Sequence, residues 1–388
     1  MKPTHAMHDL GQSLWLDNIT RDLLDDGTLR RYVDEWSVTG LTSNPTIFEQ
    51  ALKNSRAYDA SIATRVARGE RGEALFFALA IEDLARAADV FAPVHQRTAG
   101  VDGYVSLEVS PDLARDAAGT VAEARRLWQI VDRPNLMIKV PGTPEGADAV
   151  KQLIADGINV NVTLLFAIEA HARVIDAYLD GLEQRAAAGL PIDRIASVAS
   201  FFVSRVDSAI DKQLETMAIA DESQSLALRA LQGKAAIANA KLAYRLFTAS
   251  FSGPRWAALA ARGARVQRPL WASTSTKNPA YRDVIYVEEL IGTDTVNTLP
   301  PATLEAFRDH GEVRESVTTD LGGAERALAA LEAVGVSLRE VTDRLLVEGL
   351  ASFEQSFVTL LAGLTRKRAA LAADAASVSP SGAVVVSH

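Results

Sequence analysis

The chain has 388 residues, of which 48% are hydrophobic, so it is long enough to bury a large core. Its formal net charge of −9 shows no electrostatic footprint for nucleic acid, and we expect no nucleic-acid partner. The lack of cysteine excludes disulfides, thiolate metal ligands and cysteine nucleophiles, and it favours the cytoplasm. The first residues, MKPTHAMHDLGQSLW, lack the apolar core of a signal peptide, and no run of about 20 apolar residues predicts a membrane span.

Eight short strand-like runs alternate with longer helix-like runs. In chain order the strand-like runs are SLWLD (13–17), VTGLTSN (38–44), YVSLEV (104–109), NLMIKV (135–140), INVNVTLL (158–165), ASVASFF (196–202), RPLWAS (268–273) and DTVNTLP (294–300). Alternating β and α segments imply a parallel sheet, and eight such units favour a closed barrel over an open sheet. The sequence therefore predicts an α/β protein, a (β/α)8 TIM barrel with additional helices.

Two segments are too long for the single helix that a barrel unit needs. Residues 45–103 are expected to carry inserted helices, and residues 301–371 several helices beyond the eighth strand. No repeat or linker divides the chain, so we expect one domain over residues 1–372. The segment 373–388 is rich in small residues with Pro and Gly, which is typical of a disordered tail. The basic cluster at 366–368 is expected to face water at a helix end.

Apolar and polar side chains alternate along these strands. In the fourth run, Leu136, Ile138 and Val140 share one face, whereas Met137 and Lys139 share the other. A half-solvated antiparallel sheet would also alternate, but the intervening helices indicate parallel crossovers with both faces covered. In a barrel the polar parity faces inward, where active sites form at the C-terminal strand ends. The residues expected to converge there are Asp17, Asn44, Glu108, Lys139, Asn161, Thr163, Ser200 and Ser273. Trp15, Trp271 and Met137 are placed on the inward parity as barrel core.

A lysine inside a barrel can act as a nucleophile. Burial disfavours its ammonium form, and only the neutral amine attacks a carbonyl to form a Schiff base. The alternative is a structural ion pair of Lys139 with Glu108 or Asp17. The acids and amides expected at the same strand ends favour a catalytic role for Lys139 over a structural one. Glu108 and Asp17 are then candidate general acids and bases. The amides of Asn44 and Asn161 suit sugar hydroxyls, and Thr163 could hold a water.

Five motifs occur in the order found in one known family. The motifs are LTSNPTIF (41–48), SLEVSP (106–111), LMIKVPGT (136–143), INVNVTLLF (158–166) and ASFFVSR (199–205). Together they resemble the transaldolases over about residues 10–365. The resemblance implies a class I aldolase-type barrel that moves a dihydroxyacetone unit between sugar phosphates in the pentose phosphate pathway, without a cofactor or a metal.

The resemblance also implies roles for the matching residues. Lys139 matches the Schiff-base lysine, and Glu108 the acid/base that works through a water held with Thr163. Asp17 matches the carboxylate that takes the proton of the hydroxyl next to the cleaved bond. The remaining matches are substrate contacts, namely Asn44 and Asn161 for the dihydroxyacetone hydroxyls and Ser200 and Phe202 in the pocket.

Substrate phosphates require cations at the rim of the pocket. Arg205 follows the sixth strand at a helix start, where the helix dipole also favours an anion, and Ser273 could add a hydroxyl. Many family members carry an arginine two residues after this serine, whereas this chain has Ser275. We expect Lys277 to supply the second cation instead.

Two other functions stay open at this point. An enzyme like fructose-6-phosphate aldolase would cleave without an acceptor, but such enzymes carry glutamine and tyrosine where this chain has Glu108 and Phe202. A non-catalytic sugar-phosphate-binding barrel would be expected to lack at least one of Lys139, Glu108 and Asp17. The histidines show no metal-ligand spacing, and no phosphate loop follows a strand. From the resemblance alone, a helical surface is expected to mediate a homodimer.

Overall fold

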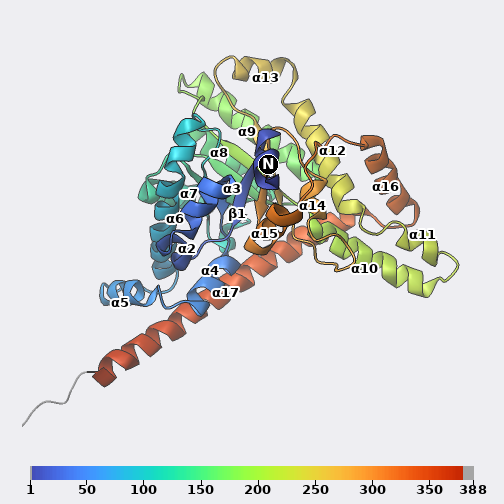
Figure 1. Ribbon diagram of the computed structural model, residues 1–388. Coiled ribbons are helices and arrows are strands. Elements are labelled where there is room, and N and C mark those ends of the chain that lie inside the picture. The colour runs from blue at the N-terminus through green and yellow to red at the C-terminus, as the bar shows by residue number, and fades with distance from the viewer. Residues whose placement is uncertain (1, 379–388) are drawn as a thin grey trace, which may run out of the picture.

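The computed structural model describes residues 2–378, with side chains up to residue 373. Its centre is a closed barrel of eight parallel strands, each paired with its neighbours in chain order (Figure 1). The strands are β1 (Gln12–Asp17), β2 (Val38–Thr42), β3 (Val105–Glu108), β4 (Leu136–Pro141), β5 (Val160–Leu165), β6 (Ser197–Phe202), β7 (Gln267–Ala272) and β8 (Thr295–Leu299). The predicted (β/α)8 barrel is confirmed, and each strand-like run overlaps one strand.

Helices surround the barrel. They are α1 (Pro3–Asp9), α2 (Arg21–Asp25), α3 (Thr28–Trp36), α4 (Pro45–Asn54), α5 (Asp59–Ala67), α6 (Gly72–Arg97), α7 (Ala117–Val131), α8 (Pro144–Asp156), α9 (Ile168–Ala187), α10 (Ser204–Ala220), α11 (Ser225–Arg229), α12 (Ala235–Ser250), α13 (Gly253–Ala260), α14 (Ile285–Glu288), α15 (Pro301–His310), α16 (Leu321–Ala333) and α17 (Leu338–Val378), with a 3-10 turn η1 at Pro111–Leu113. The segment 45–103 holds α4, α5 and α6, and the segment after β8 holds α15 to α17. Because these helices share one continuous buried core with the barrel, we propose that residues 1–372 form a single domain.

The strand register sorts the buried side chains between the inside of the barrel and the helix layer. Trp15 fills the interior so closely that a Cβ on Gly40 would lie 2.6 Å from its indole, so only glycine fits at that position. Trp271, expected inside, instead pairs in register with Phe201, and their rings lie 6.3 Å apart. Phe201 in turn lies 5.8 Å from His171 of α9. The prediction for Trp271 was therefore wrong: this side chain points toward the helix layer, and its neighbours Leu270 and Ala272 face the inside of the barrel.

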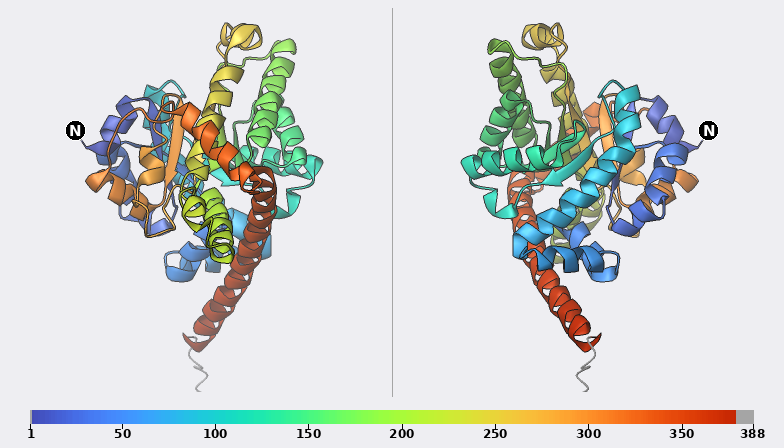
Figure 2. Two further views of the ribbon diagram at one scale, coloured as in Figure 1. Left: turned by 90° about the vertical axis from the view of Figure 1, so that its right-hand side faces the viewer. Right: turned by 90° about the vertical axis from the view of Figure 1, so that its left-hand side faces the viewer.

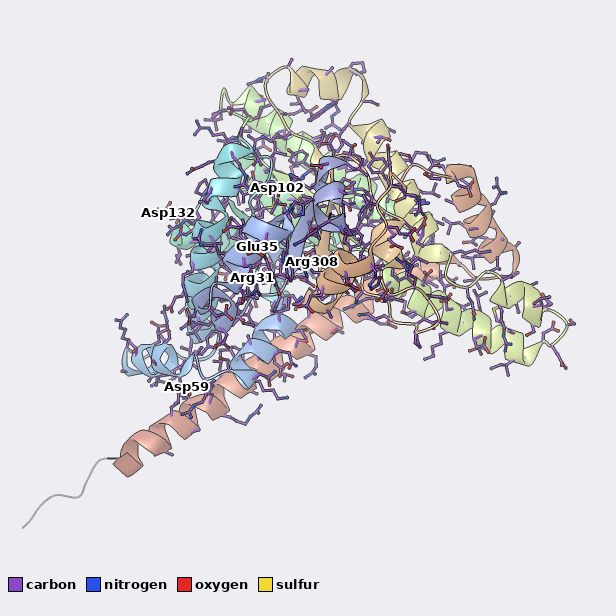
Figure 3. The ribbon with its side chains drawn as sticks, in the orientation of Figure 1. Arg31, Glu35, Asp59, Asp102, Asp132 and Arg308 are labelled. Carbon is purple, nitrogen blue, oxygen red and sulfur yellow. The ribbon has the colours of Figure 1, made fainter. Side chains whose placement is uncertain are left out.

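Polar side chains close the N-terminal end of the barrel. Asp102 accepts hydrogen bonds from Trp15 Nε1 at 2.8 Å and from the Ser13 hydroxyl, and Figure 3 labels it within the body of the molecule. Arg268 donates to Ser13 at 2.7 Å and lies 3.7 Å from the Asp102 carboxylate. These buried groups satisfy one another's hydrogen-bonding capacity, and active sites of such barrels form at the opposite, C-terminal end.

The C-terminal helix α17 packs across the open end of the barrel. It spans 41 residues and extends beyond the body of the protein (Figures 1 and 2). A Cβ on Gly349 would lie 3.1 Å from Leu164, so the helix approaches the barrel closely there. Lys367, expected to face water, instead forms an ion pair of 2.9 Å with Asp59 of α5, which lies beside α17 in Figure 3.

Two further expectations concern α17. Within the described residues, α17 is the helix that could cross a membrane by length and composition alone. No apolar run of that length was predicted from the sequence. Its apolar residues Phe353, Phe357, Leu360 and Leu364 are buried against the body of the protein. Residues 373–378, assigned to the tail, are helical. The rest of that segment, 379–388, lies outside the described residues.

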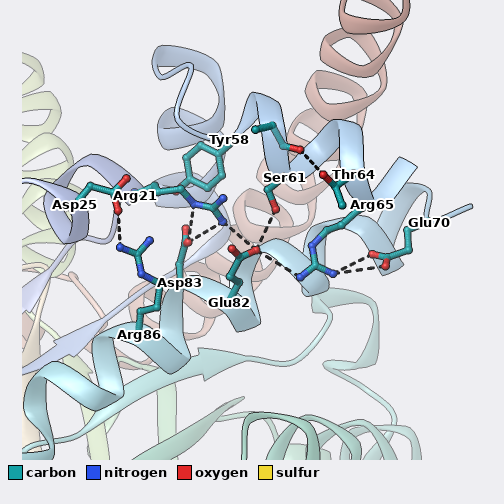
Figure 4. A network of polar contacts seen from close by, with 11 residues as sticks. Arg21, Asp25, Tyr58, Ser61, Thr64, Arg65, Glu70, Glu82, Asp83 and Arg86 are labelled. Carbon is teal, nitrogen blue, oxygen red and sulfur yellow. Dashed lines mark hydrogen bonds and ion pairs between the residues drawn. The ribbon is translucent and has the colours of Figure 1, made fainter. Parts of the chain in front are cut away.

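A buried ion pair ties α2 to the inserted helices (Figure 4). Arg21 is the first residue of α2. Its guanidinium lies 2.9 Å from the Asp83 carboxylate of α6 and 4.6 Å from the ring of Tyr58. The Asp83 side chain is 0% exposed, whereas the neighbouring pair of Arg86 with Asp25 is about half exposed. The two pairs therefore offer a matched comparison of buried and surface charge.

Replacing Arg21 with alanine should destabilise the protein strongly. The change leaves the Asp83 carboxylate buried without its cation, and removal of one partner of a buried pair costs about 3–5 kcal/mol. Replacing Arg86 with alanine should cost only about 0–1 kcal/mol, because water screens that pair. Urea unfolding of both variants measures the difference. Equal losses of unfolding free energy in the two would contradict this assignment.

Candidate active site

Lys139 lies near the C-terminal end of β4 with its ammonium buried. In the sheet register it pairs with Glu108 of β3 on one side and Asn161 of β5 on the other. Its Nζ donates to the Ser43 carbonyl at 2.8 Å and lies 3.3 Å from Glu108 Oε2. The Lys139 side chain is only 7% exposed. Strand pairing therefore brings the lysine and a carboxylate together, as the alternation predicts.

A cavity of about 190 Å³ opens above Lys139 at the C-terminal ends of the strands. Its walls come from β1, β2, β4, β5, β6, β7 and β8, from the loops that follow them, and from α17. Nine of the predicted site residues line it, namely Asp17, Asn44, Lys139, Thr163, Ser200, Phe202, Arg205, Ser273 and Lys277. The other two predicted site residues, Glu108 and Asn161, do not line the cavity.

Glu108 lies behind the lysine, with Lys139 as its ion-pair partner. Burial raises the pKa of Glu108, and the ammonium of Lys139 opposes that shift without cancelling it. Burial likewise raises the pKa of Asp17, against the hydrogen bond that Asp17 accepts from Thr42 at 2.8 Å. A raised carboxyl pKa suits a group that both gives and takes a proton, so both groups are candidates for general acid/base roles.

The two asparagines differ in what they can offer a ligand. Asn44 is the N-cap of α4, where its Oδ1 accepts from Ile47 N at 3.0 Å, so Nδ2 is its atom able to donate into the cavity. Asn161 is fully buried beneath the cavity: its Nδ2 donates to Ser106 at 3.1 Å, and its Oδ1 accepts from Ser200 at 2.6 Å. Ser200 lines the cavity and links Asn161 to it through this hydrogen bond. Thr163 does line the cavity and is 1% exposed.

Two cations stand at the rim of the cavity. Arg205 is in the first turn of α10 with its guanidinium 5.6 Å from the Phe202 ring, and Lys277 donates to Ser275 at 2.6 Å. Burial, and next the charge of Arg205, lower the pKa of Lys277. Among the side chains described, those of residues 2–373, neither cation forms an ion pair with a carboxylate. Two facing cations without a carboxylate partner favour an anionic ligand.

Ser273 reaches the cavity by a turn of the backbone, not by strand alternation. It follows β7 with φ of 55°, in the left-handed region, and its hydroxyl lies 3.1 Å from that of Ser204. Strand parity would have turned this residue toward the helices, as it does Trp271. Left-handed residues other than glycine cluster at functional sites, which accords with a ligand contact here.

Sequence reasoning missed six residues of the cavity wall, of which three carry a hydroxyl or an aromatic ring next to Asp17 or Lys139. Thr42 and Thr298 line it, and their hydroxyls lie 2.6 Å apart next to Asp17. Both fall inside predicted strands on the inward parity, so the alternation could have found them. Phe353 comes from α17 and places its ring 5.9 Å from Lys139 Nζ. No local signal in the sequence shows where a helix beyond the last strand crosses the barrel.

A buried lysine paired with one carboxylate, with a second carboxylate in the same cavity wall at the C-terminal end of a closed α/β barrel, is typical of enzymes that form Schiff bases. Within residues 2–373, no group of three or more histidine, aspartate or glutamate side chains is placed to hold a metal ion. The fold and the site therefore indicate the class of lysine-dependent barrel enzymes.

Comparison with known proteins narrows this class. Residues 14–364 match the family model described as transaldolase/fructose-6-phosphate aldolase, and the chain belongs to this family. A transaldolase of Thiobacillus denitrificans is 52% identical over 93% of this chain and 99% of its own length. Transaldolases of Thermobifida fusca and Trichodesmium erythraeum are 48% and 45% identical over 95% and 93% of this chain, and over 99% and 96% of their own lengths. The resemblance drawn from the five motifs is confirmed.

Proposed function

We propose that this protein is a transaldolase of the pentose phosphate pathway. It transfers a dihydroxyacetone unit from sedoheptulose 7-phosphate to glyceraldehyde 3-phosphate, which yields erythrose 4-phosphate and fructose 6-phosphate. One observation carries the proposal: Lys139 Nζ lies beside a carboxylate, beneath a polar cavity whose rim holds two cations. The named relatives are transaldolases over nearly their whole lengths, which supports the same activity here.

The first half of the reaction breaks a C–C bond. The neutral amine of Lys139 attacks the ketone carbon of the donor, and loss of water forms an iminium. Asp17 takes the proton of the hydroxyl on the far side of the scissile bond. That bond then breaks, the aldose phosphate leaves, and its electron pair stays on the lysine-bound fragment as an enamine. The iminium is the electron sink, so no cofactor is required.

The second half reverses these steps with a new aldehyde. The enamine carbon attacks the acceptor carbonyl, whose oxygen takes a proton from Asp17. Water then adds to the iminium and releases the ketose, with Glu108 moving protons through a water held with Thr163. Glu108 lies 3.3 Å from Nζ, which suits proton transfer at this nitrogen. Asn44 and Ser200 hold the dihydroxyacetone hydroxyls, Asn161 orients Ser200, and Phe202 forms one wall of the pocket.

Arg205, Lys277 and Ser273 are proposed to bind the substrate phosphate. Arg205→Gln should raise KM for fructose 6-phosphate about 10- to 100-fold, because a charge-assisted hydrogen bond contributes about 1.5–3 kcal/mol. The more exposed Lys277 should contribute less, about three- to tenfold on substitution by glutamine. Unphosphorylated fructose provides the matched control, since its KM should not change. Equal effects on both sugars would contradict a phosphate site.

An acceptor-omission assay tests the proposed activity. The protein is mixed with fructose 6-phosphate, with or without erythrose 4-phosphate, and sedoheptulose 7-phosphate and free dihydroxyacetone are measured. A transaldolase forms the heptulose phosphate fast and free dihydroxyacetone slowly. An aldolase instead releases dihydroxyacetone at a rate that does not need the acceptor. A folded protein without either product would support a non-catalytic barrel.

The setting of the enzyme is proposed from the same resemblance. Its partners are sugar phosphates, with neither nucleic acid nor a membrane required, and its place of action is the cytoplasm. We also propose that it forms a homodimer. Sedimentation velocity at micromolar concentration distinguishes a dimer from a monomer.

A further inference from the structure

One wall of the cavity comes from outside the barrel. The polar walls belong to the strand ends and their loops, whereas Phe353 is delivered by α17, more than fifty residues after β8. The other large apolar group in the wall is Phe202. Phe353 is 7% exposed, and its ring is 5.9 Å from Lys139 Nζ. An aromatic ring therefore stands next to the atom that carries the proposed intermediate.

The position of this ring is fixed by packing along α17. One turn before it, Gly349 lets the helix approach Leu164 closely, because a Cβ there would lie 3.1 Å from the leucine side chain. Leu360 is 1% exposed farther along the helix, and Lys367 holds Asp59 at 2.9 Å. Phe353 is thus part of a packed wall on the barrel.

The proposed intermediate has two possible fates. The enamine on Lys139 can attack an acceptor aldehyde, which completes the transfer. Alternatively, its carbon takes a proton, water adds to the resulting iminium, and the C–N bond breaks. The second path returns the amine to Lys139 and releases free dihydroxyacetone. Water must reach the iminium carbon in the second path before an acceptor arrives, so a dry apolar wall slows the loss.

We propose that Phe353 is a specificity-determining residue that makes the enzyme transfer its dihydroxyacetone unit instead of releasing it. The inference rests on the proposed transaldolase function. The ring lies 5.9 Å from Nζ and occupies space that water would otherwise fill beside that atom. Helix α17 therefore contributes to the choice between transferase and aldolase chemistry.

The test is the ratio of free dihydroxyacetone released without acceptor to heptulose phosphate formed with acceptor. Phe353→Ala should raise this ratio about tenfold, since opening one wall admits water at the lysine. Leu360→Ala is the matched control: it removes a buried side chain from the same helix, away from the cavity, and should leave the ratio unchanged. If Phe353→Ala does not fold, Phe353→Leu replaces it. Leucine keeps an apolar side chain at this position but does not extend as close to Nζ as the ring, so the ratio should rise about threefold.

The outcomes separate this inference from the function on which it rests. A wild-type protein without transfer would contradict the proposed transaldolase activity itself. A wild type that transfers, with an unchanged ratio in a folded Phe353 variant, would overturn only the role of this ring. An equal rise in the Leu360 variant would also overturn that role, because it would assign the effect to loosening of α17.

Discussion

Replacing Lys139 with methionine should abolish transfer, with a loss on the order of 10⁴-fold or more in kcat, as is typical when a covalent nucleophile is removed. Methionine matches the length and apolar stem of lysine but has no amine. The fold should survive, because burial already raises the pKa of Glu108 and allows its carboxyl to take a proton when the cation is absent. The coupled assay with fructose 6-phosphate and erythrose 4-phosphate measures the loss.

Lys139→Arg separates a nucleophile from a structural cation. Arginine keeps the positive charge beside Glu108 but stays protonated, so it cannot form a Schiff base. We expect a loss of activity as large as in the methionine variant, while urea unfolding stays close to wild type. If the arginine variant kept a substantial rate, Lys139 would be a partner in an ion pair and the mechanism would need another nucleophile.

Replacing Glu108 with glutamine should lower kcat about 10²- to 10⁴-fold, which is the usual contribution of a general acid/base. Glutamine keeps the size of the side chain and its contact with Nζ but cannot transfer a proton. The loss should fall on the steps that make and break the iminium, so binding of substrate should change little. Rapid-quench measurement of the first turnover, with kcat and KM determined separately, shows where the loss lies.

A surface carboxylate provides the control for Glu108. Glu123 of α7 pairs with Arg126, which is 47% exposed, and it does not line the cavity, so Glu123→Gln should leave kcat unchanged. A Glu108→Gln variant with a normal kcat would contradict the proposed proton transfer. It would leave Glu108 as a structural partner that only holds the lysine in place.

Strand alternation accounts for most of what could be predicted. In a parallel barrel the strand ends converge at one opening, so the inward parity of β1, β4, β5 and β6 was enough to bring Asp17, Lys139, Thr163 and Ser200 to one cavity. The same rule brought Glu108 beside Lys139. It also placed Asn161 on the inward face, where its amide oxygen accepts a hydrogen bond from Ser200 of the cavity wall.

The remaining features depend on contacts that a local pattern does not encode. Trp271 was misplaced because the phase of β7 is set by its pairing with β6, one residue away from the assumed parity. Ser273 reaches the cavity through a left-handed residue that no strand rule anticipates. The path of α17, and with it the positions of Phe353 and Lys367, follows from helix packing over long sequence separations.

The most direct measurement of the central claim is borohydride trapping. The protein is mixed with fructose 6-phosphate, reduced, digested and mapped by mass spectrometry, with the Lys139→Met variant treated in parallel. We predict an adduct derived from dihydroxyacetone on Lys139 in the wild type and none in the variant. A folded wild type without an adduct, or with an adduct on another lysine, would contradict the account.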